Sequence, residues 1–217
     1  MPQPVKMLLF LTATLAASPV TAQTGDPSVR AFDAYAAQAA RDWGAVGLAV
    51  AVVKDGRTIF AKGYGVREVG KPEPADENTL FAIGSTTKAM TAAAIGMLVD
   101  EGKLGWDDPV TTHLPWFELA DPFVTRELTI RDLLTHRAGL ANADVLWYRT
   151  DLSYREILRR ARFIPSGYSF RSGFVYQNIM YAAAGAVVSV ASGMPWERFI
   201  EARILAPLGM TRTVTTL

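Results

Sequence analysis

The chain has 217 residues, of which 50% are hydrophobic and 20% charged, and its formal net charge is +1. This composition is typical of a globular protein with one sizeable core, and a nearly neutral chain gives no indication of a nucleic-acid partner. The lack of cysteine excludes disulfides and thiol catalysis, and the only two histidines, His113 and His136, cannot form a three-histidine zinc site. We therefore expect no cofactor.

Residues 1–22 have the features of an export signal. Lys6 precedes the apolar run MLLFLTATLAA, and Val-Thr-Ala at 20–22 fits the small-x-small cleavage rule. An uncleaved membrane anchor is the alternative, but the apolar run is shorter than the ~20 residues that a membrane span needs. The segment predicts a periplasmic or secreted protein with no stable membrane span once the signal is removed.

The next residues predict a helix followed by a β-hairpin. Pro27 opens a helical pattern that runs to about Trp43. Two β-rich segments, 47–54 and 57–65, then flank Asp55-Gly56, which is a strong signal for a two-residue hairpin turn. The first of these strands is apolar almost throughout, so we expect it to be covered on both faces.

Helical signals dominate the rest of the chain after a polar, proline-containing loop at 66–79. A helix is expected from Ser85 to about Glu101, apolar around nearly its whole circumference and therefore buried all round, with Gly102 ending it. Further helices are expected after two predicted capping boxes, Thr129–Asp132 and Ser153–Glu156, and over 178–193 and 195–206.

Two apolar or β-branched segments near the end complete the pattern. Residues 172–196 carry no charge, but polar residues and a proline interrupt them, which favours a buried core helix over a membrane span. The final segment TRTVTTL, residues 211–217, has the composition of a strand. A two-stranded hairpin is marginal by itself, so we interpret the sheet as incomplete, with further strands absent from this chain.

Ser85 and Lys88 form the first candidate catalytic pair. Residues three apart on a helix lie on one face, so the Lys88 amine can reach the Ser85 hydroxyl, which needs such a partner to act as a nucleophile. A helix N-terminus also offers free N–H groups to a developing oxyanion. The alternative is that Ser85 is an ordinary helix N-cap, because S-x-x-K is a loose pattern.

Tyr176 and Asn178 form the second candidate pair. Side chains two apart in an extended segment point to the same side, so both residues can enter one cleft. A tyrosine near an ammonium group is a candidate acid–base residue, and an asparagine can accept from a lysine amine while donating to a substrate carbonyl. The alternative is a core aromatic residue followed by a helix N-cap.

The motifs in combination resemble the serine β-lactamase and penicillin-binding-protein superfamily, in its class C-like branch with esterases and D-amino-acid peptidases. The matching segments lie, in chain order, at 79–115, 128–140, 176–200 and 205–210. The resemblance implies an α/β (α+β) fold, namely a three-layer sandwich with an antiparallel sheet plus a helical lobe. Residues 23–217 would then be the N-terminal portion of one catalytic domain, with helix and hairpin at 28–65 and a mainly helical lobe at 85–210.

The resemblance also implies roles for the four candidates. Ser85 would be the acylated nucleophile, Lys88 would assist its activation, Tyr176 would be the acid–base residue, and Asn178 would bind Lys88 and the substrate amide. His136 would be structural, and His113 is expected at the surface. The third motif of the family, a Lys-Thr-Gly or His-x-Gly triplet on a later strand, is absent from this sequence.

These features predict an exported serine hydrolase that acts through an acyl-enzyme on an amide, β-lactam or ester substrate, which would be a small molecule or a peptide. The alternative is a catalytically inactive, truncated relic or binding protein of the same fold. An α/β-hydrolase is disfavoured because the sequence contains no G-x-S-x-G pentapeptide. The sequence gives no indication of oligomeric state.

Overall fold

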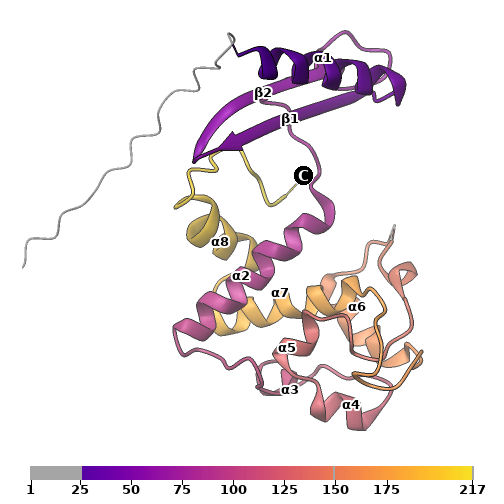
Figure 1. Cartoon of the computed structure of the whole chain (residues 1–217). Helices are drawn as coiled ribbons and strands as arrows, with labels where there is room; N and C mark the ends of the chain where they lie inside the picture. Colours follow the sequence, from indigo (N-terminus) through magenta and orange to yellow (C-terminus); the bar gives the residue numbers. More distant parts are fainter. Residues whose placement is uncertain (1–25, 149, 217) are drawn as a thin grey trace, which may run out of the picture. The chain divides into compact units, whose positions relative to one another are not determined.

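The computed structural model describes residues 26–148 and 150–216, so the predicted export signal at 1–22 lies outside the described residues. The chain forms two compact units, one ending at Leu80 and the other beginning at Phe81. The first holds α1, β1 and β2, and the second holds the remaining helices (Figure 1).

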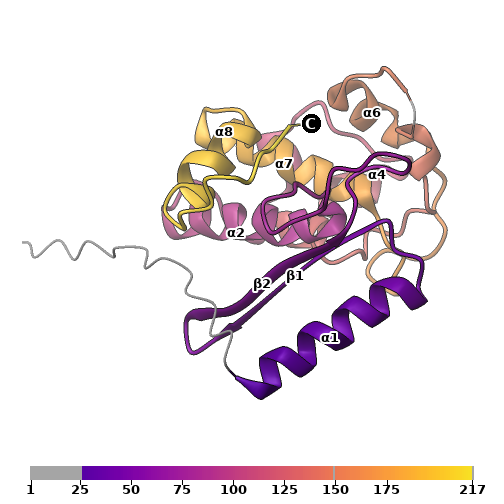
Figure 2. The ribbon, with the colours of Figure 1, turned by 90° about the horizontal axis from the view of Figure 1, so that it is seen from above.

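The first unit is a hairpin with one helix against it. Helix α1 (Pro27–Asp42) precedes strands β1 (Gly47–Lys54) and β2 (Arg57–Gly65), which pair antiparallel with the predicted boundaries. Both turn residues between the strands have positive φ, 51° at Asp55 and 70° at Gly56, which is the type I′ geometry that this dipeptide favours. Figure 2 shows α1 as a separate layer beside the hairpin.

An aromatic contact and a polar cluster hold α1 on the hairpin. The rings of Phe32 and Phe60 meet edge to face with centroids 5.3 Å apart. The Asp33 carboxylate accepts hydrogen bonds of 2.8 Å from Lys62 Nζ and from the Tyr64 hydroxyl. Burial and this hydrogen bond raise the pKa of Tyr64 to about 12. Because Phe60, Lys62 and Tyr64 alternate along β2, one face of the hairpin carries all of these contacts.

The prediction that the first strand is covered on both faces is wrong for the described residues. Along β1, Leu48, Val50 and Val52 are half-buried, while the side chains that alternate with them are exposed, as far as 67% for Val53. Within its own unit, α1 packs against one face of the two-stranded sheet. The apolar composition of β1 therefore did not predict how much of the strand is buried in the described residues of this unit.

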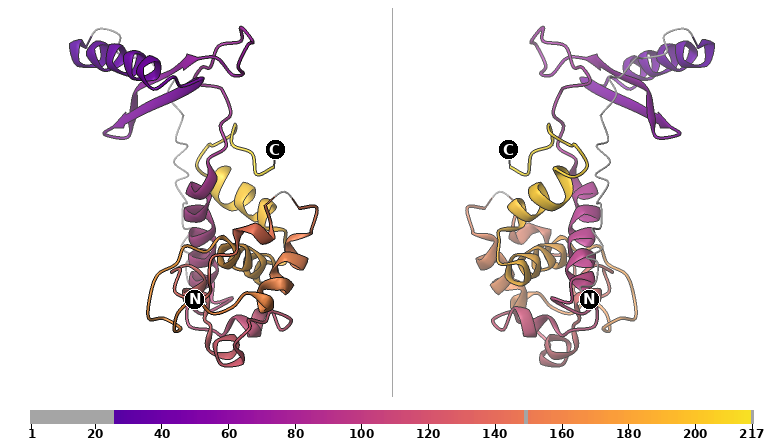
Figure 3. Two further views of the ribbon diagram at one scale, coloured as in Figure 1. Left: turned by 90° about the vertical axis from the view of Figure 1, so that its right-hand side faces the viewer. Right: turned by 90° about the vertical axis from the view of Figure 1, so that its left-hand side faces the viewer.

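The second unit is helical around one hydrophobic core. Two long helices, α2 (Thr87–Asp100) and α7 (Asn178–Ser192), pack against each other, and Figure 3 shows them crossing. The shorter helices are α3 (Val110–His113), α4 (Pro122–Glu127), α5 (Ile130–Leu133), α6 (Tyr154–Arg160) and α8 (Trp196–Ile200). Single turns of 3₁₀-helix are η1 (Gly84–Thr86), η2 (Asp144–Leu146) and η3 (Ala161–Phe163), and η4 (Glu201–Leu205) is a π-helical turn.

The two long helices differ in how many of their residues are buried. Helix α7 contributes seven buried residues, in agreement with the predicted core helix. Helix α2 buries four, Thr91, Ala94, Ile95 and Leu98, whereas Ala89 and Ala93 are exposed. The prediction that α2 is buried all round is therefore wrong for the described residues. Much of its apolar character comes from alanine, whose small side chain costs little at a surface.

The structure bears on a membrane span only for the described helices, and not for the predicted signal at 1–22. No single helix among them is long and apolar enough to cross a membrane. Together, Asn178–Ser192 and Trp196–Leu205 meet the criterion by length and composition, as a pair bent by 75°.

Helix ends mostly follow the predicted signals. Gly102 (φ 67°) follows α2, and Gly193 (φ 74°) caps α7 in the left-handed conformation. The capping box at Thr129–Asp132 has both of its hydrogen bonds. At α6 the Ser153 hydroxyl accepts from the Glu156 N–H, but the Glu156 carboxylate accepts from Arg160 at 2.9 Å, so the second half of that box is replaced by an ion pair.

The strand-like C-terminal segment does not form a strand in the described residues. Residues 211–216 are turn, bend and irregular structure, although five of them are Thr or Val. β-branched composition favours a strand only where a partner strand supplies hydrogen bonds. The two-stranded sheet of the described residues does not include this segment.

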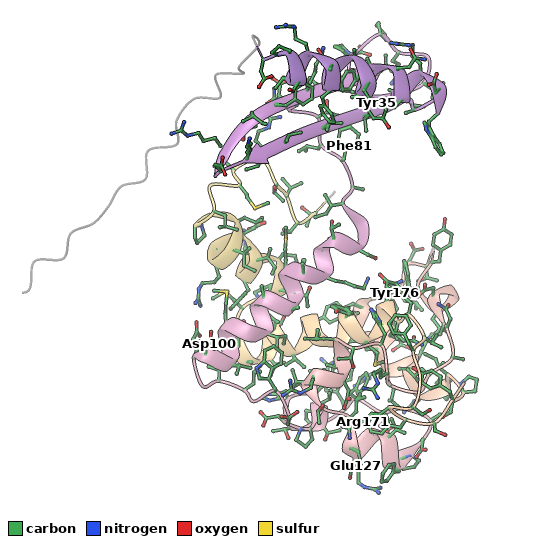
Figure 4. All side chains as sticks on the ribbon, viewed as in Figure 1. Tyr35, Phe81, Asp100, Glu127, Arg171 and Tyr176 are labelled. Atoms are coloured by element: carbon green, nitrogen blue, oxygen red, sulfur yellow. The ribbon has the colours of Figure 1, made fainter. Side chains whose placement is uncertain are left out.

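An ion pair between the buried Asp132 and the partly exposed Arg171 holds loops of the second unit together. Asp132 is 6% exposed and accepts from Arg171 Nη2 at 2.6 Å, and the same guanidinium donates to the Glu127 carbonyl (Figure 4). Burial, the largest influence, raises the pKa of Asp132, but hydrogen bonds from Arg171 and Thr129 outweigh it, and the net pKa lies below its ordinary value. The carboxylate therefore stabilises the fold in its ionised form.

We expect Asp132→Ala to lower the free energy of unfolding by about 1–3 kcal/mol near neutral pH, because Arg171 and the Thr129 N–H lose their acceptor. Since the folded pKa is depressed, this stabilisation is present above the unfolded pKa of ~3.9 and is lost as the pH falls through the folded value. Urea unfolding of both proteins across that range measures it. Asp107→Ala is the matched control: it removes an exposed ion pair with Arg131, and we expect a much smaller change. Equal losses for the two variants would contradict the assignment.

Candidate functional site

Ser85 and Lys88 meet where η1 runs into α2. Gly84 has φ 51°, a conformation that suits glycine, and it starts the turn that exposes Ser85 at the helix N-terminus. One turn later, Lys88 Nζ donates to Ser85 Oγ over 3.0 Å. The contact predicted from the i, i+3 spacing is therefore present.

Tyr176 and Asn178 reach the same point from the segment that enters α7. The Tyr176 hydroxyl donates to Ser85 Oγ at 2.5 Å, and Lys88 Nζ donates to Asn178 Oδ1 at 2.6 Å. Figure 4 places Tyr176 at the start of α7. All four predicted site residues are thus joined by hydrogen bonds, across some ninety positions of sequence. Every one of them belongs to the second unit.

Gln177, which the sequence analysis did not single out, supports this segment from the opposite side. Its side chain is 1% exposed, and its amide Nε2 donates to the carbonyls of Leu140 (2.8 Å) and Ala141 (3.1 Å). The alternation that sends Tyr176 and Asn178 towards Ser85 sends Gln177 into the core. The period-two pattern was a usable signal for its direction, but nothing in the sequence identified its acceptors.

The Lys88 ammonium lies between two aromatic rings. It is 4.7 Å from the centroid of Tyr176 and 5.3 Å from that of Tyr181, whose hydroxyl donates to the Leu134 carbonyl. Both ring faces attract a cation. With Ser85 Oγ and Asn178 Oδ1 as acceptors, this cage holds the lysine amine in one place.

The electrostatic consequence of that position falls on Tyr176. Interaction with Lys88, and then the hydrogen bond with Ser85, lower the pKa of the Tyr176 phenol, against a smaller opposing effect of burial. A lowered phenol pKa makes the phenolate accessible at lower pH than in a free tyrosine. At a given pH, a larger fraction of Tyr176 is therefore phenolate than for a free tyrosine.

Asp144, at the start of η2, fixes the orientation of Asn178. Its Oδ2 accepts from Asn178 Nδ2 at 3.1 Å, and its Oδ1 accepts from Trp147 Nε1 at 3.2 Å. Lysine has only donors and a carboxylate only acceptors, so Oδ1 of the amide must face Lys88 and Nδ2 must face Asp144. One of the two hydrogens on Nδ2 remains for another acceptor. No motif in the sequence indicated Asp144.

The two histidines differ in their relation to the site. His136, predicted to be structural, is 9% exposed, and its ring stacks on Tyr176 with centroids 4.5 Å apart. His113, which was expected at the surface, is half-buried. Its side chain is 13% exposed, and its ring forms a hydrogen bond with Asp108 at 3.2 Å.

One hollow on the described surface lies apart from Ser85. It measures about 640 Å³ and is lined by residues of α4 and two loops: Asp121, Phe123, Val124, Gly139, Ser166, Gly167, Tyr168, Ser169 and Phe170. The described residues contain no group of three or more His, Asp or Glu side chains that could hold a metal ion. The hydrogen bonds among Ser85, Lys88, Tyr176 and Asn178 define the candidate site.

Comparison with known proteins gives consistent matches. A family model described as Beta-lactamase matches residues 32–217. Among curated proteins, the chain is 31% identical over 195 residues to "Unguisins hydrolase ungD" of Aspergillus violaceofuscus, covering 86% of this chain and 34% of the relative. It is 34% identical over 198 residues to "Esterase EstB" of Burkholderia gladioli, covering 82% and 49%.

A solved structure extends the comparison to the fold. The D-amino acid amidase of Ochrobactrum anthropi SV3, in complex with L-phenylalanine amide, superimposes with a TM-score of 0.73 at 26% identity, covering 85% of this chain and 52% of that one. The predicted fold class is thereby confirmed. The chain spans about a third to a half of the length of the curated relatives it matches.

Proposed function

This chain belongs to the β-lactamase family, and on that premise we propose that it is a serine hydrolase that forms an acyl-enzyme on Ser85. Relatives that are described as hydrolase, esterase and amidase support a hydrolase. The observation that carries the serine mechanism is the pair of hydrogen bonds to Ser85 Oγ, from Tyr176 at 2.5 Å and from Lys88 at 3.0 Å.

In the proposed acylation, the Tyr176 phenolate takes the proton of Ser85 Oγ as that oxygen bonds to the carbonyl carbon of the substrate. The carbonyl electrons move onto oxygen, where the Ser85 N–H, in the first turn of the helix and without an intrahelical acceptor, is a donor to the oxyanion. Collapse of this intermediate expels the alkoxide or amine, which takes the proton back from Tyr176. Throughout, Lys88 keeps the phenolate charge compensated.

In the proposed deacylation, Tyr176 removes a proton from water as the water oxygen attacks the acyl carbon. Ser85 Oγ leaves and recovers the proton, which restores the starting state. Asn178 has two parts in this scheme: Oδ1 holds Lys88, and the hydrogen on Nδ2 that Asp144 does not use is a donor to the substrate carbonyl or amide.

The substrates we propose are small acyl compounds or peptides with an ester, amide or β-lactam bond. Purified chain is tested against a nitrophenyl ester, a D-amino acid anilide and a chromogenic β-lactam, with Ser85→Ala as the blank. Turnover of one class that is lost in the variant supports the proposal. Equal rates for both proteins on all three, together with no covalent labelling of Ser85, would favour an inactive relative or binding protein.

Asp144 provides a prediction that does not require knowledge of the substrate. We expect Asp144→Ala to free the Asn178 amide, weaken its hold on Lys88, and slow acylation of Ser85 by about 10- to 100-fold, since one hydrogen bond to a charged group contributes ~1.5–3 kcal/mol. Asp144→Asn keeps an acceptor for Asn178 Nδ2 and should retain most of the rate. Quenched time courses of labelling by a fluorophosphonate measure the rate at Ser85 in the two variants. Equal impairment of the two variants would contradict a role in orientation.

We also propose that the protein is exported to the periplasm or medium, on the strength of residues 1–22. Expression in a bacterial host should then yield a mature chain that begins at Gln23. Mass spectrometry of the fractionated protein measures this. Recovery of the unprocessed chain from the membrane fraction would favour the anchor instead, and Ala22→Tyr is a control that should block processing.

A further inference from the structure

His136 holds the chain on both sides of Tyr176. Its backbone carbonyl accepts from the Val175 N–H at 3.1 Å, and its ring atom Nδ1 accepts from the Gln177 N–H at 3.0 Å. The two amides belong to the residues directly before and after Tyr176. One histidine therefore fixes the backbone of the proposed acid–base residue at two successive points.

The His136 ring also packs against the Tyr176 ring. The two are stacked with centroids 4.5 Å apart and an interplanar angle of 29°. Phe174 and Tyr181 complete the surroundings of the imidazole at 5.4 and 5.3 Å. The backbone of His136 has φ 59°, and the Tyr168 hydroxyl donates to its carbonyl, so its own position is fixed by the loop around it.

We propose that His136 is a positioning residue that holds Tyr176 against Ser85, and that it does so only as the neutral imidazole with its proton on Nε2. This inference rests on the proposed function of Tyr176 and Ser85. It concerns the tautomer and charge of a residue that does not touch the reacting atoms.

The chemistry of the contact sets the required protonation state. Nδ1 can accept from the buried Gln177 N–H only while it carries a lone pair. Protonation would turn it into a second donor facing that N–H and would add a cation close to Lys88. Burial, and then the charge of Lys88, hold the pKa of His136 below its ordinary value, which favours the neutral form.

The titratable groups near the His136 ring come from two parts of the second unit. The charge of Lys88 acts on the ring from α2, Tyr176 lies against it from the segment that leads into α7, and Tyr181 lies against it from α7 itself. Within the described residues, no carboxylate is in hydrogen-bond contact with the imidazole to stabilise its charged form.

Two variants of His136 distinguish the effect of losing the hydrogen-bond acceptor Nδ1 from the effect of losing side-chain volume. His136→Asn tolerates a positive φ and can present Oδ1 to the Gln177 N–H. His136→Leu fills space without an acceptor. We expect the leucine variant to react with a fluorophosphonate about 100-fold more slowly at Ser85, as for a catalytic group displaced by about 1 Å, and the asparagine variant to stay within a few-fold of the wild type. His113→Asn is the matched control and should react like the wild type.

Ring ¹⁵N spectra test the same proposal without any reaction, since the chain has only two histidines. We expect His136 to show the Nε2–H tautomer, and the ratio of the asparagine-variant rate to the wild-type rate to rise as the pH falls below the midpoint of that ring. A proton on Nδ1, or a leucine variant that labels as fast as the wild type, would overturn the proposal.

Failure of the proposed hydrolase function can be distinguished from failure of the positioning role of His136. If the wild-type chain is not labelled at all, the hydrolase proposal fails, while the ring spectra and the ¹³Cζ titration of Tyr176 still decide the positioning role. In that case we expect the Tyr176 titration to move in His136→Leu and to stay in His136→Asn. An unchanged titration in both would overturn the positioning role by itself.

Discussion

Replacement of Ser85 by alanine is expected to abolish acyl transfer by this chain, with a loss of about 10⁶-fold, as when the nucleophile of a serine hydrolase is removed. The reason is structural: Tyr176 and Lys88 both direct their hydrogen bonds at Ser85 Oγ. Without that oxygen they have no atom to activate. Ester hydrolysis and covalent labelling measure the loss.

The fold should survive this change, because Ser85 is exposed and its side chain contributes nothing to the core. Ser28→Ala, at another exposed serine near a helix start, is the control and should keep full activity. An unchanged midpoint of thermal unfolding in Ser85→Ala separates lost chemistry from lost structure. Turnover by Ser85→Ala at a rate close to that of the wild type would exclude Ser85 as the nucleophile, because only a small residual rate is expected without it.

Replacement of Tyr176 by phenylalanine is expected to slow acylation by about 10²–10⁴-fold, the usual contribution of a general base. The variant retains a ring to stack on His136, so the stability should change little. Because interaction with Lys88 lowers the pKa of Tyr176, the wild-type rate should rise with pH at lower values than an ordinary phenol allows. The variant should lose that limb of the profile.

Tyr154→Phe is the matched control for this experiment. It removes a hydroxyl from a tyrosine that is 59% exposed on α6, outside the hydrogen-bonded site. We expect wild-type rates and an unchanged pH profile. If Tyr176→Phe kept the same pH profile as the wild type, the proton acceptor would be another group, and Lys88 would be the first to test.

Local features of the fold were predictable because neighbouring residues determine them. The turn at Asp55-Gly56 requires positive φ at both positions, and its sequence defined both strands of the hairpin. The capping box at Thr129–Asp132 is likewise a contact within one turn of helix. Burial was less predictable. The exposed side chains of β1, and Ala89 and Ala93 of α2, depend on which elements lie against them.

The site was predictable in pairs, for the same reason. The i, i+3 spacing brought Lys88 to Ser85, and the alternation of an extended segment set Tyr176 and Asn178 on one side. That the two pairs meet across ninety residues followed only from the family resemblance. Asp144 and Gln177 were missed because their contacts, with Asn178 and with the carbonyls of Leu140 and Ala141, join loops that no motif connects.

The most direct test of Ser85 as the acylated nucleophile is intact-protein mass spectrometry of the chain after reaction with a fluorophosphonate or an activated acyl ester, followed by peptide mapping. We expect one adduct, carried by Ser85, that does not form in Ser85→Ala and forms slowly in Tyr176→Phe. An adduct on any other residue, or none under conditions in which the chain is folded, would contradict it.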